Sequence, residues 1–188
     1  APPYGLLAMS LGAMVATEWA RQAPHEVQAC VLINTSLRPF SPFYHRLRPR
    51  NYGALLGLVL RPATAEQIEQ TVLRLTSRRA AELGAVLPPW VGVRQARPVS
   101  RSNALRQLMA AARYRAPLQA PVPRMLLLGS QNDGLVSGQC SQAIAQAWQV
   151  PLALHPSAGH DLPLDDGPWV LAQIRRWLAQ EGAGGATA

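Results

Sequence analysis

The chain has 188 residues, of which 48% are hydrophobic and 15% are charged. These proportions exclude a disordered chain and predict one globular domain that is long enough to bury a core. No apolar run reaches the roughly 18 residues of a membrane span, so we expect no transmembrane segment. The first residues, "APPYG", carry neither the basic segment nor the cleavage site of a signal peptide, which favours a cytoplasmic protein.

The net charge of +8 is concentrated in the middle of the chain, and every cation is an arginine. Residues 36–117 hold 14 of the 18 cationic residues but only three of the ten acidic ones. This excess suits an anionic partner or substrate, but scattered arginines are more typical of a solvated helical surface. The chain has no glycine-rich phosphate loop, zinc-ligand spacing or basic strand with interleaved aromatics, so we expect no nucleic acid partner.

Four short apolar segments, each bounded by turn residues, predict strands at residues 5–9, 28–34, 124–129 and 151–155. Their nearly continuous apolar character suits strands that are covered on both faces. Helical patterns follow three of them, at residues 11–21, 137–148 and 169–180, with Ser137 as an expected N-cap and Pro168 in an expected first turn. Strands that alternate with such helices indicate βαβ units, so the predicted fold class is α/β with a parallel sheet of about four strands and flanking helices.

The two cysteines, Cys30 and Cys140, fall in the second predicted strand and in the helix at residues 137–148. Two cysteines cannot make a disulfide framework, and their apolar surroundings favour buried free thiols over a disulfide or a metal site. This interpretation fits a reducing compartment.

The long segment between the second and third predicted strands does not fit a simple crossover. It contains helical patterns broken by prolines, including one behind a capping box at Thr64 and Gln67 and one that starts at a cap at Ser102. We therefore predict an α/β core at residues 1–35 and 118–180, a helical lid-like insertion at residues 36–117, and a disordered tail at residues 181–188.

Ser10 lies between an apolar strand and a helical pattern, in the segment "AMSLG". The nucleophile elbow G-x-S-x-G needs small residues around its serine because the turn is sharp, and here Ala8 replaces the first glycine while Gly12 is kept. A serine in this context is either a nucleophile or an ordinary helix cap.

Two further residues occupy comparable positions. Asp133 follows the third predicted strand in "LLLGSQNDGLV", at the sheet edge where parallel folds build sites, although an aspartate before glycine also suits a plain turn. His160 follows the fourth strand in "AGHDLPL" and would supply the general base that a serine nucleophile requires. The rival acids Asp161, Asp165 and Asp166 share the histidine's own loop or the next helix start, and the last two are more simply helix N-terminal acids.

The order Ser10, Asp133, His160, each after its own strand, is the triad order of α/β-hydrolases. The segments "LLAMSLGAMVATEWA", "LLLGSQNDGLV" and "AGHDLPL" resemble the nucleophile elbow, acid loop and histidine loop of a serine hydrolase of that fold. "DGLV" and the helical middle block are similar to the carboxylesterase branch that includes the pimeloyl-acyl-carrier-protein methyl esterases. This resemblance implies a lid whose arginines receive an acidic carrier protein.

The chain also departs from the family. Members carry the first half of their sheet before the elbow, together with a loop that donates the second oxyanion-hole N–H, and neither is visible here. Only the N–H of Leu11 can be carried over. Three explanations account for the missing half of the sheet. The chain is a fragment, a natural truncated form, or one of two pieces of which the other holds the missing half. We favour a truncated hydrolase that self-associates through its open sheet edge.

The predicted function is hydrolysis of small-molecule carboxylic esters through Ser10, His160 and Asp133, with an acyl-enzyme intermediate and no metal or organic cofactor. The alternatives are an acyltransferase or thioesterase with the same triad, and a catalytically weak form that acts as an anion- or partner-binding module. Apolar positions of the insertion would line an acyl pocket, although packing between its own helices explains them better: Leu55, Leu56, Leu58, Trp90, Leu108 and Met109.

Overall fold

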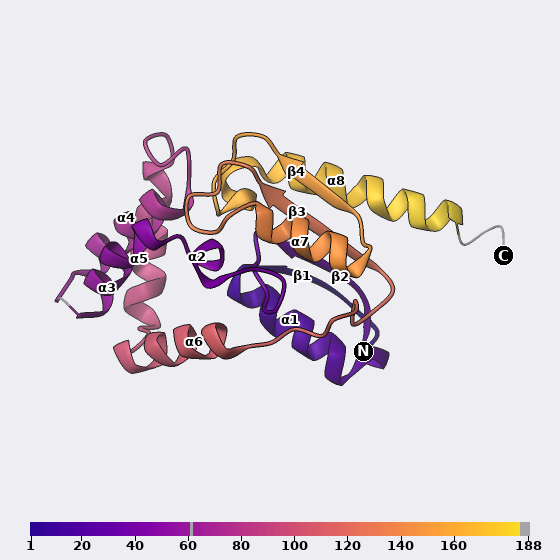
Figure 1. Cartoon of the computed structure of the whole chain (residues 1–188). Helices are drawn as coiled ribbons and strands as arrows, with labels where there is room; N and C mark the ends of the chain where they lie inside the picture. Colours follow the sequence, from indigo (N-terminus) through magenta and orange to yellow (C-terminus); the bar gives the residue numbers. More distant parts are fainter. Residues whose placement is uncertain (61, 185–188) are drawn as a thin grey trace.

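The computed structural model of the protein describes residues 1–60 and 62–184 and shows strands alternating with helices (Figure 1). The 3₁₀ turns are η1 (Pro24–Glu26), η2 (Pro49–Asn51) and η3 (Gly84–Val86). The main elements are, in chain order, β1 (Tyr4–Met9), α1 (Leu11–Gln22), β2 (Val27–Ile33), α2 (Phe43–Arg46), α3 (Tyr52–Leu60), α4 (Ala65–Thr76), α5 (Leu87–Ala96), α6 (Arg101–Arg113), β3 (Met125–Ser130), α7 (Gln139–Trp148), β4 (Leu152–His155) and α8 (Leu162–Gly184).

Within the described residues, the four strands form one parallel sheet in the order β1-β2-β3-β4. The prediction of an α/β fold with about four parallel strands is therefore confirmed. Because all strands run in the same direction, the loops that follow β1, β3 and β4 all leave from the carboxyl ends of the strands, on one side of the sheet. Ser10, Asp133 and His160 lie in these three connections.

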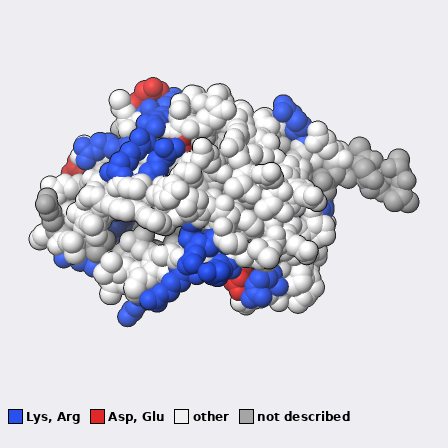
Figure 2. Space-filling model, viewed as in Figure 1, with Lys and Arg blue, Asp and Glu red and all other residues white. Residues whose placement is uncertain are grey.

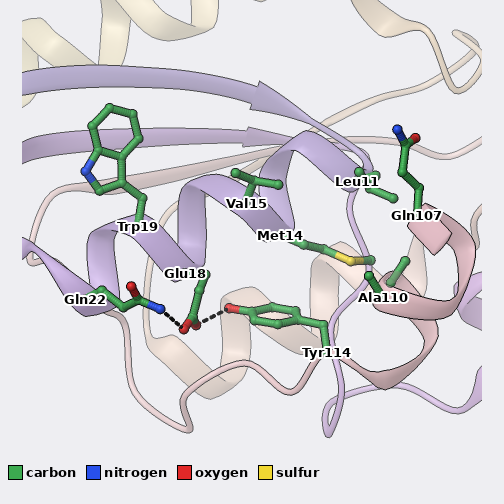
Figure 3. A pocket seen from close by; sticks show the side chains of 10 residues that line it. Leu11, Met14, Val15, Glu18, Trp19, Gln22, Gln107, Ala110 and Tyr114 are labelled. Atoms are coloured by element: carbon green, nitrogen blue, oxygen red, sulfur yellow. Dashed lines mark hydrogen bonds between the residues drawn. The ribbon is translucent and has the colours of Figure 1, made fainter. Parts of the chain in front are cut away.

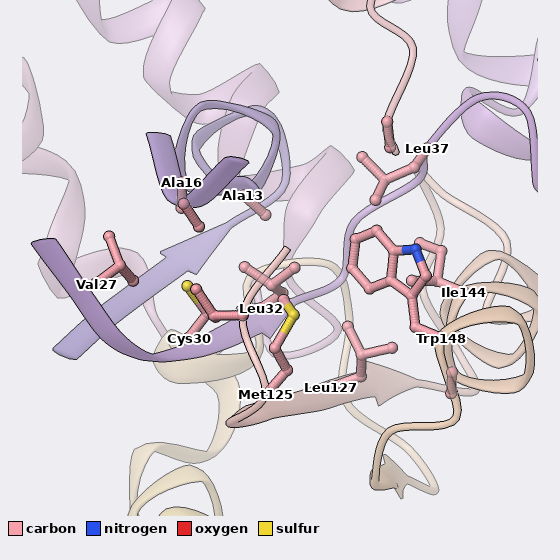
Figure 4. Packing of buried hydrophobic residues seen from close by; sticks show 14 residues of the cluster. Ala13, Ala16, Val27, Cys30, Leu32, Leu37, Met125, Leu127, Ile144 and Trp148 are labelled. Atoms are coloured by element: carbon pink, nitrogen blue, oxygen red, sulfur yellow. The ribbon is translucent and has the colours of Figure 1, made fainter. Parts of the chain in front are cut away.

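Helices cover both faces of the sheet, which explains why β2 and β3 are apolar at nearly every position (Figure 1). Alternate residues of a strand point to opposite faces. Leu32 and Leu127 pack with α1 and α7 in one buried cluster, shown in Figure 4, whereas Ile33 and Leu128 pack with α8 in another. Replacing a fully buried leucine such as Leu32 by alanine would cost about 2–5 kcal/mol of stability.

Strand β1 is one of the two edge strands of the described sheet. It pairs with β2 alone, and Leu7 in its middle is 58% exposed. The outer backbone groups of such an edge are free to pair with another strand.

The insertion between β2 and β3 is helical, as predicted, and lies at the end of the sheet where the strands finish (Figure 1). The capping box before α4 is confirmed, since the side chains of Thr64 and Gln67 each bond to the other's backbone N–H. The chain leaves the core and returns to it at one place, where Arg38 and Arg115 form an isolated parallel β-bridge.

Two predicted caps were wrong. Helix α6 begins after Ser100, whose extended backbone lets its side chain accept from the Asn103 N–H, so Ser102 lies inside the helix. Helix α7 begins after Gly138, and Ser137 contributes its backbone carbonyl to Cys140 rather than a side-chain cap.

The last helix is longer at both ends than predicted. Helix α8 starts at Leu162, which is fully buried, and its regular geometry is interrupted at Asp166 before it continues through Gly184. The predicted tail therefore begins as helix, and its remaining residues, 185–188, lie outside the described part of the chain.

Both cysteines are free and buried, as expected. Burial raises the pKa of the Cys30 thiol to about 11 and also raises that of Cys140, so both stay protonated and unreactive near neutral pH.

Candidate active site

Ser10 occupies the sharp corner between β1 and α1. Its φ of 53° and ψ of −118° lie in a region that residues with side chains rarely adopt. The corner is held on both sides, because the Ser10 N–H donates to the Ile33 carbonyl at 2.9 Å and the Ser10 carbonyl accepts from Thr35 Oγ1 at 3.0 Å. Its side chain makes no cap bond to α1, so the helix-cap interpretation of this serine is wrong.

His160 and Asp133 lie in direct contact although 27 residues separate them. The imidazole Nδ1 is 2.7 Å from Asp133 Oδ2, and the two residues are only 3% and 2% exposed. Asp133 Oδ1 accepts the backbone N–H groups of Leu135 at 2.7 Å and Val136 at 2.9 Å. The carboxylate is therefore fixed by its own loop and presents its second oxygen to the imidazole.

The rival acids are engaged elsewhere. Asp161 accepts weakly from the Leu164 N–H, and Asp166 contacts His155 and the Trp169 N–H. Burial raises the pKa of Asp161, whereas the Trp169 N–H and then His155 lower the pKa of Asp166.

Asp165 is a structural link rather than a partner of His160. One carboxylate oxygen accepts the N–H groups of Gly159 at 2.6 Å and Arg78 at 3.0 Å, and the other contacts the Ser77 hydroxyl. It thus ties the end of α4 in the insertion to the loop that carries His160.

Asn34, at the end of β2, holds that loop from the opposite side. Its amide nitrogen donates to the carbonyls of Gly159 at 3.2 Å and His160 at 2.8 Å and to Ser130 Oγ at 3.0 Å, while its oxygen accepts the Ser130 N–H. The sequence interpretation missed this residue. One signal in the sequence could have indicated its role: Asn34 is a polar residue that directly follows a buried apolar strand.

A cavity of about 350 Å³ opens beside Ser10 and Leu11 under the helical insertion. Of the insertion positions considered for an acyl pocket, Leu55 and Leu108 line it. Leu56, Leu58 and Met109 do not line it, and Trp90 lines a different cavity. The remaining lining residues, mostly apolar, are Met14, Ser36, Phe43, Arg46, Leu47, Tyr52, Ala111, Ala112, Leu135 and Val136.

A larger hollow of about 610 Å³ lies between α1 and α6 (Figure 3). Its lining is mainly apolar, with Val15 and Trp19 on α1 and Tyr114 after α6. Ser10 lines the smaller cavity but not this larger hollow, and His160 lines neither of them. Leu11 and Met14 line both spaces.

Leu11 directly follows Ser10 at the start of α1. As the first residue of α1, Leu11 has a backbone N–H that the helix itself does not use.

The described residues contain no cluster of three histidine, cysteine or acidic side chains that would hold a metal ion. Among the same residues, we find no helix with the length and hydrophobicity of a membrane span.

Comparison with known proteins identifies the family of the chain. The model of the alpha/beta hydrolase family matches residues 1–173. A search of curated proteins found no match.

Many solved structures are similar in fold, and three illustrate the range. A thermophilic esterase from Thermogutta terrifontis aligns with a TM-score of 0.66 and 20% identity, covering 95% of this chain and 65% of its own. A 2-hydroxy-6-oxo-6-phenylhexa-2,4-dienoate hydrolase from a Rhodococcus species gives 0.64 and 13%, covering 92% and 63%. A bacterial membrane phospholipase A gives 0.69 and 19%, covering 98% and 58%. The chain thus spans 58–65% of the length of these three proteins, which is less than two thirds.

Proposed function

Because the chain belongs to the alpha/beta hydrolase family, we propose that it carries the catalytic residues of a serine hydrolase that acts on carboxylic esters. The contact of 2.7 Å between His160 and Asp133 is the observation that carries this proposal. It pairs a buried imidazole with a carboxylate at the sheet edge where Ser10 also lies, as a base and its orienting acid would be paired.

Each residue has a defined role in the proposed reaction. Ser10 Oγ attacks the ester carbonyl, and His160 Nε2 accepts its proton and passes it to the leaving alcohol. Asp133 holds Nδ1–H and stabilises the imidazolium that forms. Water then attacks the acyl-enzyme, with His160 again as the base, and releases the carboxylic acid. The Leu11 N–H donates to the oxyanion in both steps.

The lining of the cavity beside Ser10 supports an ester with an apolar acyl portion, since leucine, valine, methionine and aromatic side chains predominate there. The names of the similar esterase and phospholipase also point to ester substrates. Three expectations remain predictions: a second oxyanion donor, self-association through the β1 edge, and an acidic carrier protein as partner.

Labelling with a fluorophosphonate probe tests the nucleophile directly, because the probe reacts with activated serines without turnover. We expect it to modify the wild-type chain at Ser10 and to leave Ser10→Ala unlabelled. Ser36→Ala is a matched control, since Ser36 lines the same cavity but lies outside the elbow. Equal labelling of the wild type and Ser10→Ala would contradict the assignment.

A further inference from the structure

A pocket lined by arginines adjoins the cavity beside Ser10. It has a volume of about 400 Å³, and its charged residues are Arg38, Arg46 and Arg115. Phe43, Arg46 and Ala112 line both spaces, so the Arg46 side chain stands in the wall between them. A molecule with its reactive group at Ser10 can therefore reach a guanidinium with its other end.

None of these three arginines forms an ion pair with a carboxylate among the described residues. The arginine–carboxylate ion pairs found there are Arg21–Glu18, Arg79–Glu82 and Arg94–Glu69, all outside the pocket. In Figure 2, basic side chains gather in a group at the lower middle of the visible face, where the chain passes from α6 to the core in Figure 1.

Within the described part of the chain, the hydrogen-bond partners of Arg38 and Arg46 are uncharged backbone carbonyls. Arg46 Nη2 donates to the Ala111 carbonyl at 2.6 Å, and Arg38 Nη1 reaches the Ala112 carbonyl at 3.4 Å. These contacts anchor the C-terminal end of α6, where cations are favourable. They leave the three formal charges unneutralised, and the buried Arg46 Nε has no hydrogen-bond partner in the described residues.

The surroundings of Arg46 disfavour its positive charge. Burial, followed by repulsion from Arg38, lowers the pKa of Arg46. An anion bound among the three guanidiniums would replace this repulsion with charge-assisted hydrogen bonds, which guanidinium groups make well with planar carboxylates.

We propose that this pocket binds a free carboxylate on the acyl portion of the substrate, so that the preferred substrates are half-esters of dicarboxylic acids. The ester carbonyl lies at Ser10, the apolar chain fills the cavity, and the carboxylate meets Arg46 with Arg38 and Arg115 behind it. Hydrolysis consumes one water and releases the dicarboxylic acid and the alcohol. This substrate class rests on the proposed esterase function, whereas the anion site itself can be tested without turnover.

Calorimetric titration with sodium adipate measures the anion site alone. We expect the wild type and Ser10→Ala to bind adipate equally, because Ser10→Ala removes no positive charge. Arg46→Gln should weaken binding about tenfold, and so should Arg115→Gln. The α6 carbonyls accept from Arg46 and Arg38, so Arg115→Gln removes neither of these bonds and tests the site if Arg46→Gln folds poorly. Arg175→Gln, which removes the same charge from an exposed position on α8, should bind like the wild type.

Three results would overturn the proposal: absence of adipate binding, equal weakening by Arg175→Gln, or binding of inorganic phosphate without adipate. The last would assign the pocket to a phosphate group instead.

Kinetics with two matched esters tests the substrate class. We expect 4-nitrophenyl hydrogen suberate to have a KM about tenfold lower than its neutral methyl ester, and we expect Arg46→Gln to remove this difference. Equal KM values in the wild type would overturn the assignment of the substrate. If neither ester is hydrolysed and Ser10 is not labelled, the esterase function fails, while adipate binding still decides the anion site.

Discussion

Asn34 Nδ2 lies 2.8 Å from the backbone carbonyl oxygen of His160. The same amide also bonds to Gly159 and Ser130, so one buried side chain joins the ends of β2 and β3 to the histidine loop. The ring of His160 is oriented by Asp133, but the position of its backbone depends on Asn34.

Removing the Asn34 side chain should therefore loosen the histidine loop. We expect Asn34→Gly to lose about 1–3 kcal/mol of stability, because the buried groups of Ser130 and His160 lose their partner. The φ of Asn34 is 44°, which glycine adopts without strain, so Asn34→Ala should be less stable still. Urea unfolding of both variants gives the measurement. Unchanged stability of Asn34→Gly would show that the loop is held by other contacts.

Asp133 and Asp161 lie near His160, but only Asp133 contacts its ring. We expect Asp133→Asn to reduce ester hydrolysis by about 10⁴, because the imidazole would lose the acceptor that fixes its tautomer. Asp161→Asn is the matched control and should keep most of the activity. Steady-state rates with 4-nitrophenyl esters compare the two. A larger loss in Asp161→Asn would mean that the acid is misassigned.

Gly159 is constrained by space. A Cβ atom there would lie 2.5 Å from the Thr76 carbonyl oxygen and 2.9 Å from the Arg78 nitrogen, and both are backbone atoms. Gly159→Ala should therefore push the histidine loop away from the end of α4 and destabilise the fold by about 1–3 kcal/mol. Gly167→Ala, where a Cβ would meet nothing within 4 Å, should be tolerated. Thermal unfolding distinguishes the variants, and equal midpoints would contradict the close packing.

Glu18 gives the protein a pH dependence on the acidic side. Hydrogen bonds from Arg21 and then Gln22 lower the pKa of Glu18 from 4.5 to about 2. A lowered carboxyl pKa stabilises the folded state above about pH 4.5, and this contribution disappears as the pH falls toward 2.

Because the side chains of Glu18 and Arg21 are 29% and 49% exposed, the effect should be modest and weakened by salt. We expect Glu18→Gln to lose less stability than the wild type on acidification through this range. Urea unfolding on both sides of it measures the difference. Identical pH dependence in the two proteins would argue against the Arg21 interaction.

The sheet was predictable because its strands are buried on both faces. In β2 and β3 almost every side chain enters a core, so the apolar runs are visible without knowledge of the partners. The position of Ser10 was predictable for a related reason, since a strand, a small-residue turn and a helix occur within a few residues.

The supporting contacts were not predictable because they join distant parts of the chain. Asn34 and His160 are 126 residues apart, and the Ser77–Asp165 contact spans 88 residues. Arg46 was one of many arginines in a basic segment, and only the fold shows that it lines the same cavity as Ser10. The cap at Ser102 failed because the neighbouring Ser100 takes that role. The cap at Ser137 failed because α7 begins one residue later, after Gly138, without a side-chain cap.

The bridge between Arg38 and Arg115 brings the two ends of the helical insertion side by side. An insertion whose ends meet in this way can change in length or be exchanged without altering the pairing of β2 with β3. The rest of the insertion can therefore vary in length, whereas Ser77 and Arg78 have to be kept, because Asp165 ties them to the loop that carries His160.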